Sequence, residues 1–152
     1  MAQWMTAGAT TAAGVLILGA VAGLQRAERR QETESPASRG EYLVLHVAMC
    51  VQCHTPRNAR GELDRRRLLQ GAPMPVKSPW PEQEWAFEAP SLAGLPGGWS
   101  EDQLARFLQT GKDINGRNAR PPMPPFRMNR QDALAVAAYL RSLSGGAATR
   151  PG

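Results

Sequence analysis

Cys50-Val51-Gln52-Cys53-His54 is the stretch that decides how this chain of 152 residues folds. These are the only two cysteines in the sequence, and a histidine follows the second one directly. On a helical turn, two thiols at this spacing reach the two vinyl groups on one edge of a haem, and each forms a thioether. The next residue then lies beneath the ring, where a neutral imidazole binds the iron. The motif predicts covalent haem attachment through Cys50 and Cys53, with His54 on the iron.

Other chemistries of a cysteine pair fit this sequence less well. A structural zinc site needs four ligands, usually as two pairs, and His46 is the only further cysteine or histidine. His54 is adjacent to Cys53 and is badly placed to share its metal. A thioredoxin-like pair expects a βαβ setting, which is missing, and a disulfide across so short a loop stabilises little. We interpret His46 as a packed or partly exposed helix residue.

A second axial ligand is expected if the iron only transfers electrons. Methionine is the common choice, and a thioether raises the potential relative to a second imidazole. Met123 is the best candidate because it lies in the segment Arg120-Pro121-Pro122-Met123-Pro124-Pro125-Phe126. Prolines fix φ and remove donors, so this segment is stiff and non-helical. Met128 and Met74, the latter between two prolines, are lesser candidates.

Three helices are expected around the motif. The first covers residues 41–49 and runs directly into the cysteines. The second begins at Ser100, which starts a capping box, and stops at Gly111. The third begins after the N-cap Asn129, has the i, i+3, i+4, i+7 spacing of an amphipathic helix, and ends at Gly145.

The remaining segments have distinct compositions. Residues 1–24 are predicted to form a transmembrane anchor, because positions 5–24 carry no charge and are long enough to cross a bilayer. A signal peptide cleaved after Ala22 is the alternative. Residues 25–39 predict a flexible linker, residues 40–143 the folded domain, and residues 144–152 a disordered tail. Residues 71–98 show neither strand alternation nor helical periodicity.

The charge pattern bears on the partners. Lysine and arginine number 18 against 13 acidic residues, which are interleaved, and no basic block contains aromatic residues. Nucleic acid is therefore not the expected partner. If the cations near Met123 surround an exposed haem edge, they attract an acidic patch on a redox partner, less so at high salt. These charges are Lys112, Arg117, Arg120, Arg127 and Arg130, against Asp113 and Asp132.

The chain resembles the single-haem class I cytochrome c family, in its membrane-anchored bacterial form. The resemblance covers residues 40–143 and rests on the sequences Gly40-Glu41-Tyr42-Leu43, Cys50-Val51-Gln52-Cys53-His54-Thr55-Pro56, Trp99-Ser100 and Ala138-Tyr139-Leu140-Arg141-Ser142-Leu143, together with positions 104–111 and the Met123 segment.

This resemblance implies an all-α cytochrome c fold wrapped around one covalent haem c, preceded by an N-terminal transmembrane helix. The first and last helices are expected to cross near Gly40 and Tyr139. The resemblance also implies that Pro56 hydrogen-bonds the His54 ring. In the bacterial family, haem is attached on the outer side of the cytoplasmic membrane, so the haem domain is expected on the periplasmic side.

The expected function is single-electron transfer by a carrier that is not itself an enzyme. One possibility is a membrane-tethered carrier in a respiratory or photosynthetic chain. Another is a fixed cytochrome c subunit of a larger membrane dehydrogenase or oxidase, for which the long stretch at residues 71–96 is typical. A haem enzyme or gas sensor with an open iron site is a third. Trp80 and Trp85 are unusual; they either cover the haem or pack the loop, and packing is favoured.

Overall fold

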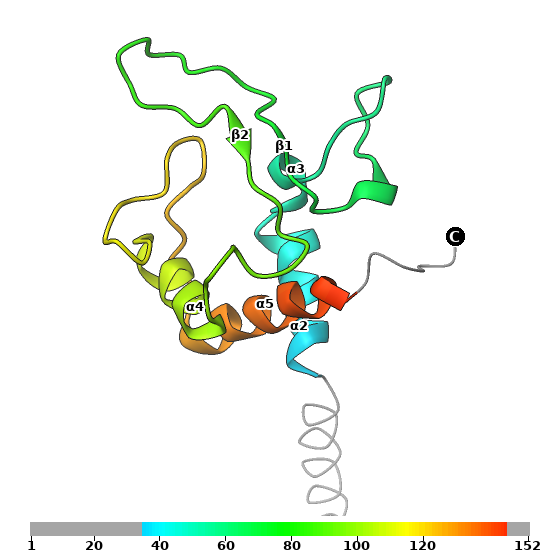
Figure 1. Cartoon of the computed structure of the whole chain (residues 1–152), viewed down its shortest axis with the longest axis vertical. Coiled ribbons are helices and arrows are strands. Elements are labelled where there is room, and N and C mark those ends of the chain that lie inside the picture. Colours follow the sequence, from blue (N-terminus) through cyan, green and yellow to red (C-terminus); the bar gives the residue numbers. More distant parts are fainter. Residues whose placement is uncertain (1–34, 146–152) are drawn as a thin grey trace, which may run out of the picture. The chain divides into compact units, whose positions relative to one another are not determined.

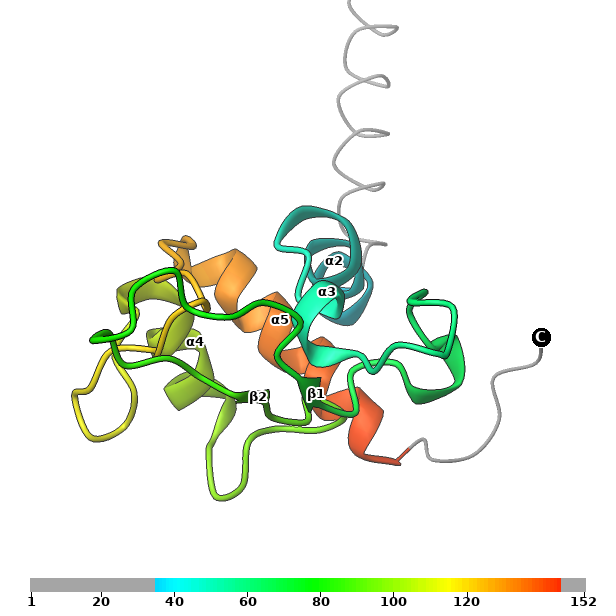
Figure 2. The same ribbon diagram turned by 90° about the horizontal axis from the view of Figure 1, so that it is seen from above.

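The chain forms a helical domain whose helices meet at one core (Figure 1). This computed structural model describes residues 35–145. The longer helices are α2 (Pro36–Tyr42), α4 (Glu101–Thr110) and α5 (Arg130–Ser142). Seen from above, α5 runs between α4 on one side and α2 with α3 (Val51–His54) on the other (Figure 2). The buried core includes Leu43, Val44, Leu69, Leu104, Leu108, Val136, Tyr139 and Leu140.

The first helix begins earlier and ends differently from the prediction. Helix α2 starts at Pro36, so the last four residues of the predicted linker are helical. Proline is favoured in the first turn of a helix, where its missing N–H costs nothing. A π-helical turn, η1 (Leu43–Val47), follows, and Met49 has a left-handed φ of 54° before Cys50. The helix therefore does not run straight into the motif.

The crossing of the first and last helices is confirmed. A Cβ atom on Gly40 would overlap the carbonyl of Ala135 and lie 2.8 Å from the Cβ of Tyr139. Only glycine allows the two backbones to approach so closely. Arg39, one residue earlier, donates from Nε to the Asp132 carboxylate of α5 at 3.0 Å, which fixes the crossing from outside.

Both predicted ends of the second helix and the predicted start of the third are also confirmed, whereas α5 ends at Ser142, before the predicted Gly145. Ser100 and Gln103 form a complete capping box at the start of α4, and Gly111 ends it at φ 74°. The side chain of Asn129 accepts the backbone N–H of Asp132 at the start of α5. The 3₁₀ turn η3 (Leu143–Gly145) continues α5, so the first two residues of the predicted tail are ordered by it.

The stretch between the attachment motif and α4 contains a small strand pair that the sequence did not predict. Strands β1 (Ala72–Pro73) and β2 (Glu88–Ala89) pair antiparallel, with Ala72 opposite Ala89. Each strand has only two residues, so it is too short for an alternating pattern to be visible. The pair closes residues 74–87 into one long excursion, which we call the tryptophan loop.

The predicted membrane anchor cannot be compared with this fold. Residues 1–34 and 146–152, which hold the anchor, most of the linker and most of the tail, lie outside the described residues. Within residues 35–145, no helix has the length and apolar character needed to span a bilayer.

Candidate functional site

Helix α3 carries the attachment motif. Cys50 is its N-cap residue, and the backbone N–H of His54 donates to the Cys50 carbonyl at 2.9 Å. Val51 is buried in the core and anchors the turn from the inside. Cys50 and Cys53 are half-buried and carry free thiols. The structure therefore brings both cysteines and the histidine together on a single turn, as the motif predicts.

The environment of His54 prepares one ring nitrogen for a metal. The side chain is buried, with 7% of the residue exposed, and Nδ1 lies 2.7 Å from the carbonyl oxygen of Pro90. Because a carbonyl only accepts, Nδ1 carries the proton and Nε2 keeps its lone pair. Burial lowers the pKa of the His54 imidazole, which keeps the ring neutral. A neutral imidazole with a free Nε2 is the form that binds iron.

The prediction that Pro56 hydrogen-bonds the His54 ring is wrong. The Pro56 carbonyl instead accepts the backbone N–H of Asp64 at 2.8 Å. Thr55 is extended, so the chain leaves the ring immediately after His54. Pro90 follows strand β2 and reaches the ring from a segment 36 positions further along the chain. No local sequence pattern links two positions so far apart. The one hint in the sequence is that a proline backbone has a carbonyl acceptor and no N–H donor.

Burial also governs the thiol chemistry. It raises the pKa of Cys50 to about 11, and the nearby Cys53 adds to the rise. A thiol with so high a pKa remains protonated near neutral pH. Across residues 35–145, no three His, Cys, Asp or Glu side chains gather in a way that could hold a metal ion.

The Met123 candidate lies on a different segment. We call residues 119–128 the methionine arm; both of its ends are attached to α4. The N–H of Ala119 donates to the Gly111 carbonyl at 3.3 Å, and that of Met128 to the Leu108 carbonyl at 3.2 Å. Met123 itself is half-buried. In Figure 1 the arm and α3 lie on opposite sides of the segment that carries β2.

The other candidate methionines have different surroundings. Met128 packs against the core, which is the ordinary gap-filling use of methionine. Met74 begins the tryptophan loop, where its N–H extends the strand pair by donating to the Phe87 carbonyl at 2.8 Å. His46 is exposed and its ring lies 5.8 Å from that of Tyr42, centroid to centroid.

Charges around the methionine arm are more balanced than the sequence suggested. Arg117 pairs with Asp113 at 3.0 Å and Arg130 with Asp102 at 3.4 Å. Arg120 lies 3.9 Å from Glu84 of the tryptophan loop. The predicted positive face therefore includes acidic side chains from α4 and from the loop, which sequence proximity did not reveal. Asp132 is engaged elsewhere, by Arg39.

A stronger excess of positive charge lies beside the attachment motif. We call residues 57–67 the arginine lobe; it holds five arginines against Glu62 and Asp64. Arg60 pairs with Glu62 and Arg67 with Asp64. The remaining three are Arg57, which donates to Gln52 inside the motif at 3.2 Å, and the exposed Arg65 and Arg66.

Comparison with known proteins gives consistent matches. The sequence profile of the family described as Cytochrome c matches residues 37–144. The fructose dehydrogenase cytochrome subunit of Gluconobacter japonicus is 32% identical over 115 residues, covering 70% of this chain and 22% of that subunit. A nicotinate dehydrogenase subunit of Pseudomonas putida is 34% identical over 133 residues, covering 80% of this chain and 10% of that protein.

A third relative carries two haems by its name. The diheme cytochrome c-type protein of Cereibacter sphaeroides is 32% identical over 108 residues, covering 68% of this chain and 34% of that protein. The chain thus spans about a third or less of the length of each of these relatives.

Proposed function

Because this chain belongs to the cytochrome c family, we propose that it carries one haem c and transfers single electrons as the haem-bearing subunit of a membrane dehydrogenase. The observation that carries the proposal is the buried His54, whose Nδ1 is held by the Pro90 carbonyl and which directly follows Cys53. That arrangement leaves one imidazole nitrogen and two thiols available on one turn.

The residues present fit a covalent haem. Cys50 and Cys53 would form the thioethers, His54 would bind the iron through Nε2, and Met123 would supply the sixth ligand. A bound haem supplies reversible one-electron chemistry at its iron. Free thiols and a neutral, oriented imidazole are the chemical forms that such attachment requires. Pro56 lies beside the site but makes no contact with the ring nitrogen, so it is not assigned a role there.

The sequence supports a single haem. One Cys-x-x-Cys-His motif uses both cysteines of the chain, so a second attachment site of this type has no residues to form it. The named diheme relative is about three times as long as the region that it shares with this chain, since the match covers 34% of it.

The protein's own residues set the conditions for electron transfer. The Pro90 carbonyl fixes the tautomer and orientation of His54. The core around Val51 excludes water from one side of the turn. If His54 and Met123 both held the iron, this chain would supply both of its protein ligands and leave no site on it for a substrate. The chain is accordingly an electron carrier and not the catalytic subunit.

The names of the relatives favour the subunit role over the free carrier. One relative is named as the cytochrome subunit of a fructose dehydrogenase, and another as a subunit of a nicotinate dehydrogenase. Detergent-solubilised protein from native membranes should therefore purify together with a catalytic dehydrogenase polypeptide. Protein that elutes alone from every detergent tested would favour the membrane-tethered carrier instead.

In this proposal the partner docks on the arginine lobe and not on the methionine arm. Three of the arginines around the arm, Arg117, Arg120 and Arg130, have acidic partners, and only Arg127 has none among the described residues, whereas the adjacent Arg65 and Arg66 both lack an ion-pair partner there. Arg57 ties the lobe to the attachment motif, so an acidic partner bound there would lie next to the thioether edge. Positive charge at this edge raises the encounter rate and loses its effect as salt rises.

Reaction with the anionic oxidant ferricyanide tests this docking site. Replacing Arg65 and Arg66 with glutamine should slow oxidation of the reduced protein about two- to fivefold at low salt, with no difference at high salt. The matched control removes two charges from the arm side, Arg117→Gln with Arg127→Gln, and should slow the reaction less. An equal or larger effect in the control would indicate that the partner docks on the methionine arm.

The location follows from the same proposal. Haem attachment of this kind in the bacterial family takes place outside the cytoplasm, and residues 5–24 are apolar enough to tether the chain. The haem domain then lies on the periplasmic face of the cytoplasmic membrane.

Intact mass is the decisive test of the haem. The purified full chain should weigh as much as the polypeptide plus one haem, and its reduced form should not bind carbon monoxide readily. A colourless product, or the mass of the bare polypeptide, would contradict the proposal. Avid carbon monoxide binding by the native reduced protein would instead favour the open iron site of a sensor or enzyme.

A further inference from the structure

The middle of the methionine arm is held by a segment other than α4. Its two ends bond to the carbonyls of Gly111 and Leu108. Between them, the carbonyl of Pro121 accepts the backbone N–H of Ala86 at 2.8 Å. Ala86 belongs to the tryptophan loop, so this bond joins the loop to the arm two residues before Met123. Met123 is itself in the turn that its N–H closes onto the Arg120 carbonyl at 3.2 Å.

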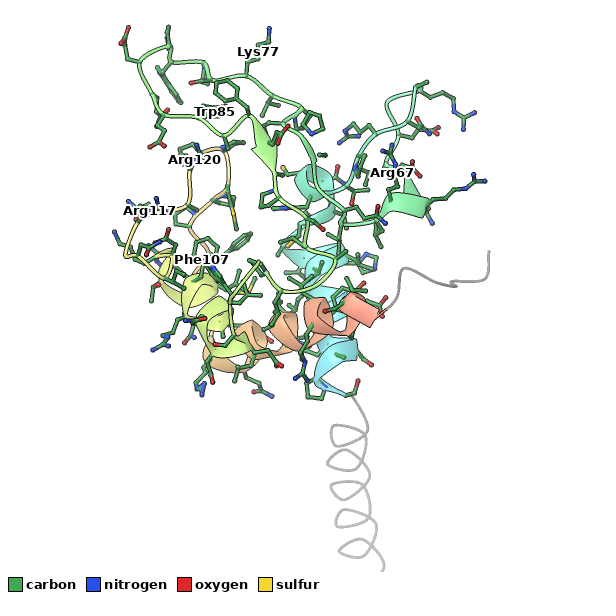
Figure 3. The ribbon with its side chains drawn as sticks, viewed as in Figure 1. Arg67, Lys77, Trp85, Phe107, Arg117 and Arg120 are labelled. Atoms are coloured by element: carbon green, nitrogen blue, oxygen red, sulfur yellow. The ribbon has the colours of Figure 1, made fainter. Side chains whose placement is uncertain are left out.

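The conformation of the tryptophan loop determines whether Ala86 can reach the arm. The loop contains no helix, and its base is fixed by the β1–β2 pair and by the bond from Met74 to Phe87. Above that base, the indole Nε1–H of Trp85 donates to the Val76 carbonyl at 3.1 Å. This bond joins the outgoing and returning limbs of the loop directly beside Ala86. Figure 3 shows Trp85 on the loop, close to Arg120 on the arm.

Trp80 differs from Trp85 in this respect. It lies at the tip of the loop and 62% of it is exposed. Its backbone bonds to the hydroxyl of Ser78, two residues away. Among the described residues its indole, unlike that of Trp85, makes no hydrogen bond to the other limb. The two tryptophans of one loop provide a linking residue and a matched comparison.

We propose that the tryptophan loop positions Met123 for the iron, and that Trp85 is the positioning residue which fixes the loop. This inference rests on the proposed function, because it requires Met123 to be the sixth ligand. Without the Trp85 link, the returning limb gains conformational freedom that must be lost again each time Ala86 bonds to Pro121. The turn that carries Met123 would then spend more time away from the iron, and the sixth coordination position would be vacant more often.

Carbon monoxide binding to the reduced protein measures that open fraction. Carbon monoxide can bind only when the methionine position is vacant, so its apparent affinity rises in proportion to the vacant fraction. Loss of one hydrogen bond of ordinary strength shifts such an equilibrium about two- to tenfold. The ferric protein gives a second readout, since the sulfur-to-iron charge-transfer band at long wavelength weakens as methionine leaves.

The experiment compares four variants of the full haem-loaded chain. Trp85→Phe keeps an aromatic ring but removes the N–H, and should raise the apparent carbon monoxide affinity about two- to tenfold and weaken the charge-transfer band. Trp80→Phe should leave both as in the native protein. Met123→Ala sets the fully open limit. Ala86→Pro breaks the bond to Pro121 at its donor and should act in the same direction as Trp85→Phe.

The outcomes separate the two proposals. If Met123→Ala equals the native protein in carbon monoxide binding, Met123 is not the ligand and the proposed function fails. If Met123→Ala opens the site but Trp85→Phe and Ala86→Pro behave as the native protein does, the positioning role is wrong while the ligand assignment stands. An equal effect of Trp80→Phe and Trp85→Phe would also overturn it. Should Trp85→Phe fail to accumulate with haem, Ala86→Pro decides alone.

Discussion

The two sides of the haem site are built on different principles. On the attachment side, His54 and Thr55 are both buried, and a distant carbonyl from Pro90 fixes the ring. On the methionine side, Met123 is half-buried on a segment without secondary structure. Prolines limit the backbone of this arm, and three backbone hydrogen bonds, two to α4 and one to the tryptophan loop, attach it to the rest of the domain.

This difference teaches that, of the two proposed iron ligands, His54 belongs to the core and Met123 to the loops. Closely packed cores have few alternative arrangements, whereas loops with few buried contacts open at low cost in free energy. The histidine side should therefore determine whether the haem is held at all. The methionine side should determine the ligand field and access to the iron.

The largest effect expected from this comparison concerns the attachment itself. Cys50→Ser with Cys53→Ser should give a chain with the mass of the bare polypeptide, because no thioether can form. Met123→Ala should retain the full haem mass and differ only in ligation. Mass spectrometry of both proteins, expressed side by side, checks this. If Met123→Ala also emerges without covalent haem, the two sides are not separable.

The second effect concerns stability: a substitution on the attachment side should cost more free energy of unfolding than one on the methionine side. Leu69 is fully buried on the attachment side, where its N–H donates to the Thr55 hydroxyl at 3.0 Å. Leu69→Ala should lower the free energy of unfolding by about 3 kcal/mol, because it leaves a cavity. Met128→Ala, at the half-buried end of the arm, should cost about half as much. Guanidinium titration of the two haem-loaded variants gives the comparison, and equal losses would argue against it.

The sequence predicted the turn that carries the Cys-x-x-Cys-His motif and the N-caps of α4 and α5 for local reasons. The motif, the Ser100 capping box and the Asn129 cap each depend on residues within a few positions of one another. The Pro90 carbonyl could not be predicted in the same way, because it meets His54 from 36 positions away.

The arm and the tryptophan loop were less predictable for a related reason. Prolines indicated a stiff segment, yet its support by Ala86 depends on how two irregular segments fold against each other. For Trp85 the sequence favoured packing within the loop, but it did not predict the hydrogen bond from the indole to the Val76 carbonyl, nine positions away. The acidic partners of Arg120 and Arg130 are likewise distant in sequence, and their absence from the local pattern made the arm look more positive than it is.

Backbone strain provides a third and smaller test of the comparison. Met49 and Leu69 are the two non-glycine residues with positive φ within residues 35–145, and both lie on the attachment side. Met49 is 44% exposed, so its side chain contributes little to the core. Met49→Gly should raise the free energy of unfolding by about 0.5 kcal/mol, because glycine adopts this conformation without a Cβ penalty.

Met49→Ala is the matched control for that variant. It removes the same side chain but retains the Cβ, so the left-handed conformation still carries its cost and no gain is expected. Thermal unfolding of the three haem-loaded proteins provides the measurement. A gain in the alanine variant as large as that in the glycine variant would mean that side-chain removal, and not relief of the backbone, produced the effect.

The smallest effect expected is the loss of stability at low pH that arises from two similar turns. One turn contains Asp64 on the attachment side, and the other contains Asp113 on the methionine side. Asp64 in the arginine lobe accepts from Arg67 and from the Arg66 backbone, and these contacts lower its pKa. Asp113, before the arm, accepts from Arg117 and Asn115, and its pKa is lowered as well. A carboxylate with a depressed folded pKa stabilises the fold above the unfolded pKa near 4 and loses that contribution as the pH falls through the folded value.

Asp64→Asn and Asp113→Asn should each flatten the fall of the thermal midpoint below about pH 4, since the amide does not titrate. Both carboxylates are half-buried but pair with arginines that are largely exposed, so each change should be small. Asp64 also donates its backbone N–H to the Pro56 carbonyl, two residues after His54, the proposed haem ligand. Asp64→Asn should therefore reduce the acid-induced rise in hydrogen exchange within the attachment turn, whereas Asp113→Asn should reduce it only around residues 112–118. If both variants altered the attachment turn equally, the two sides of the site would be one cooperative unit, and the contrast between a core ligand and a loop ligand would be lost.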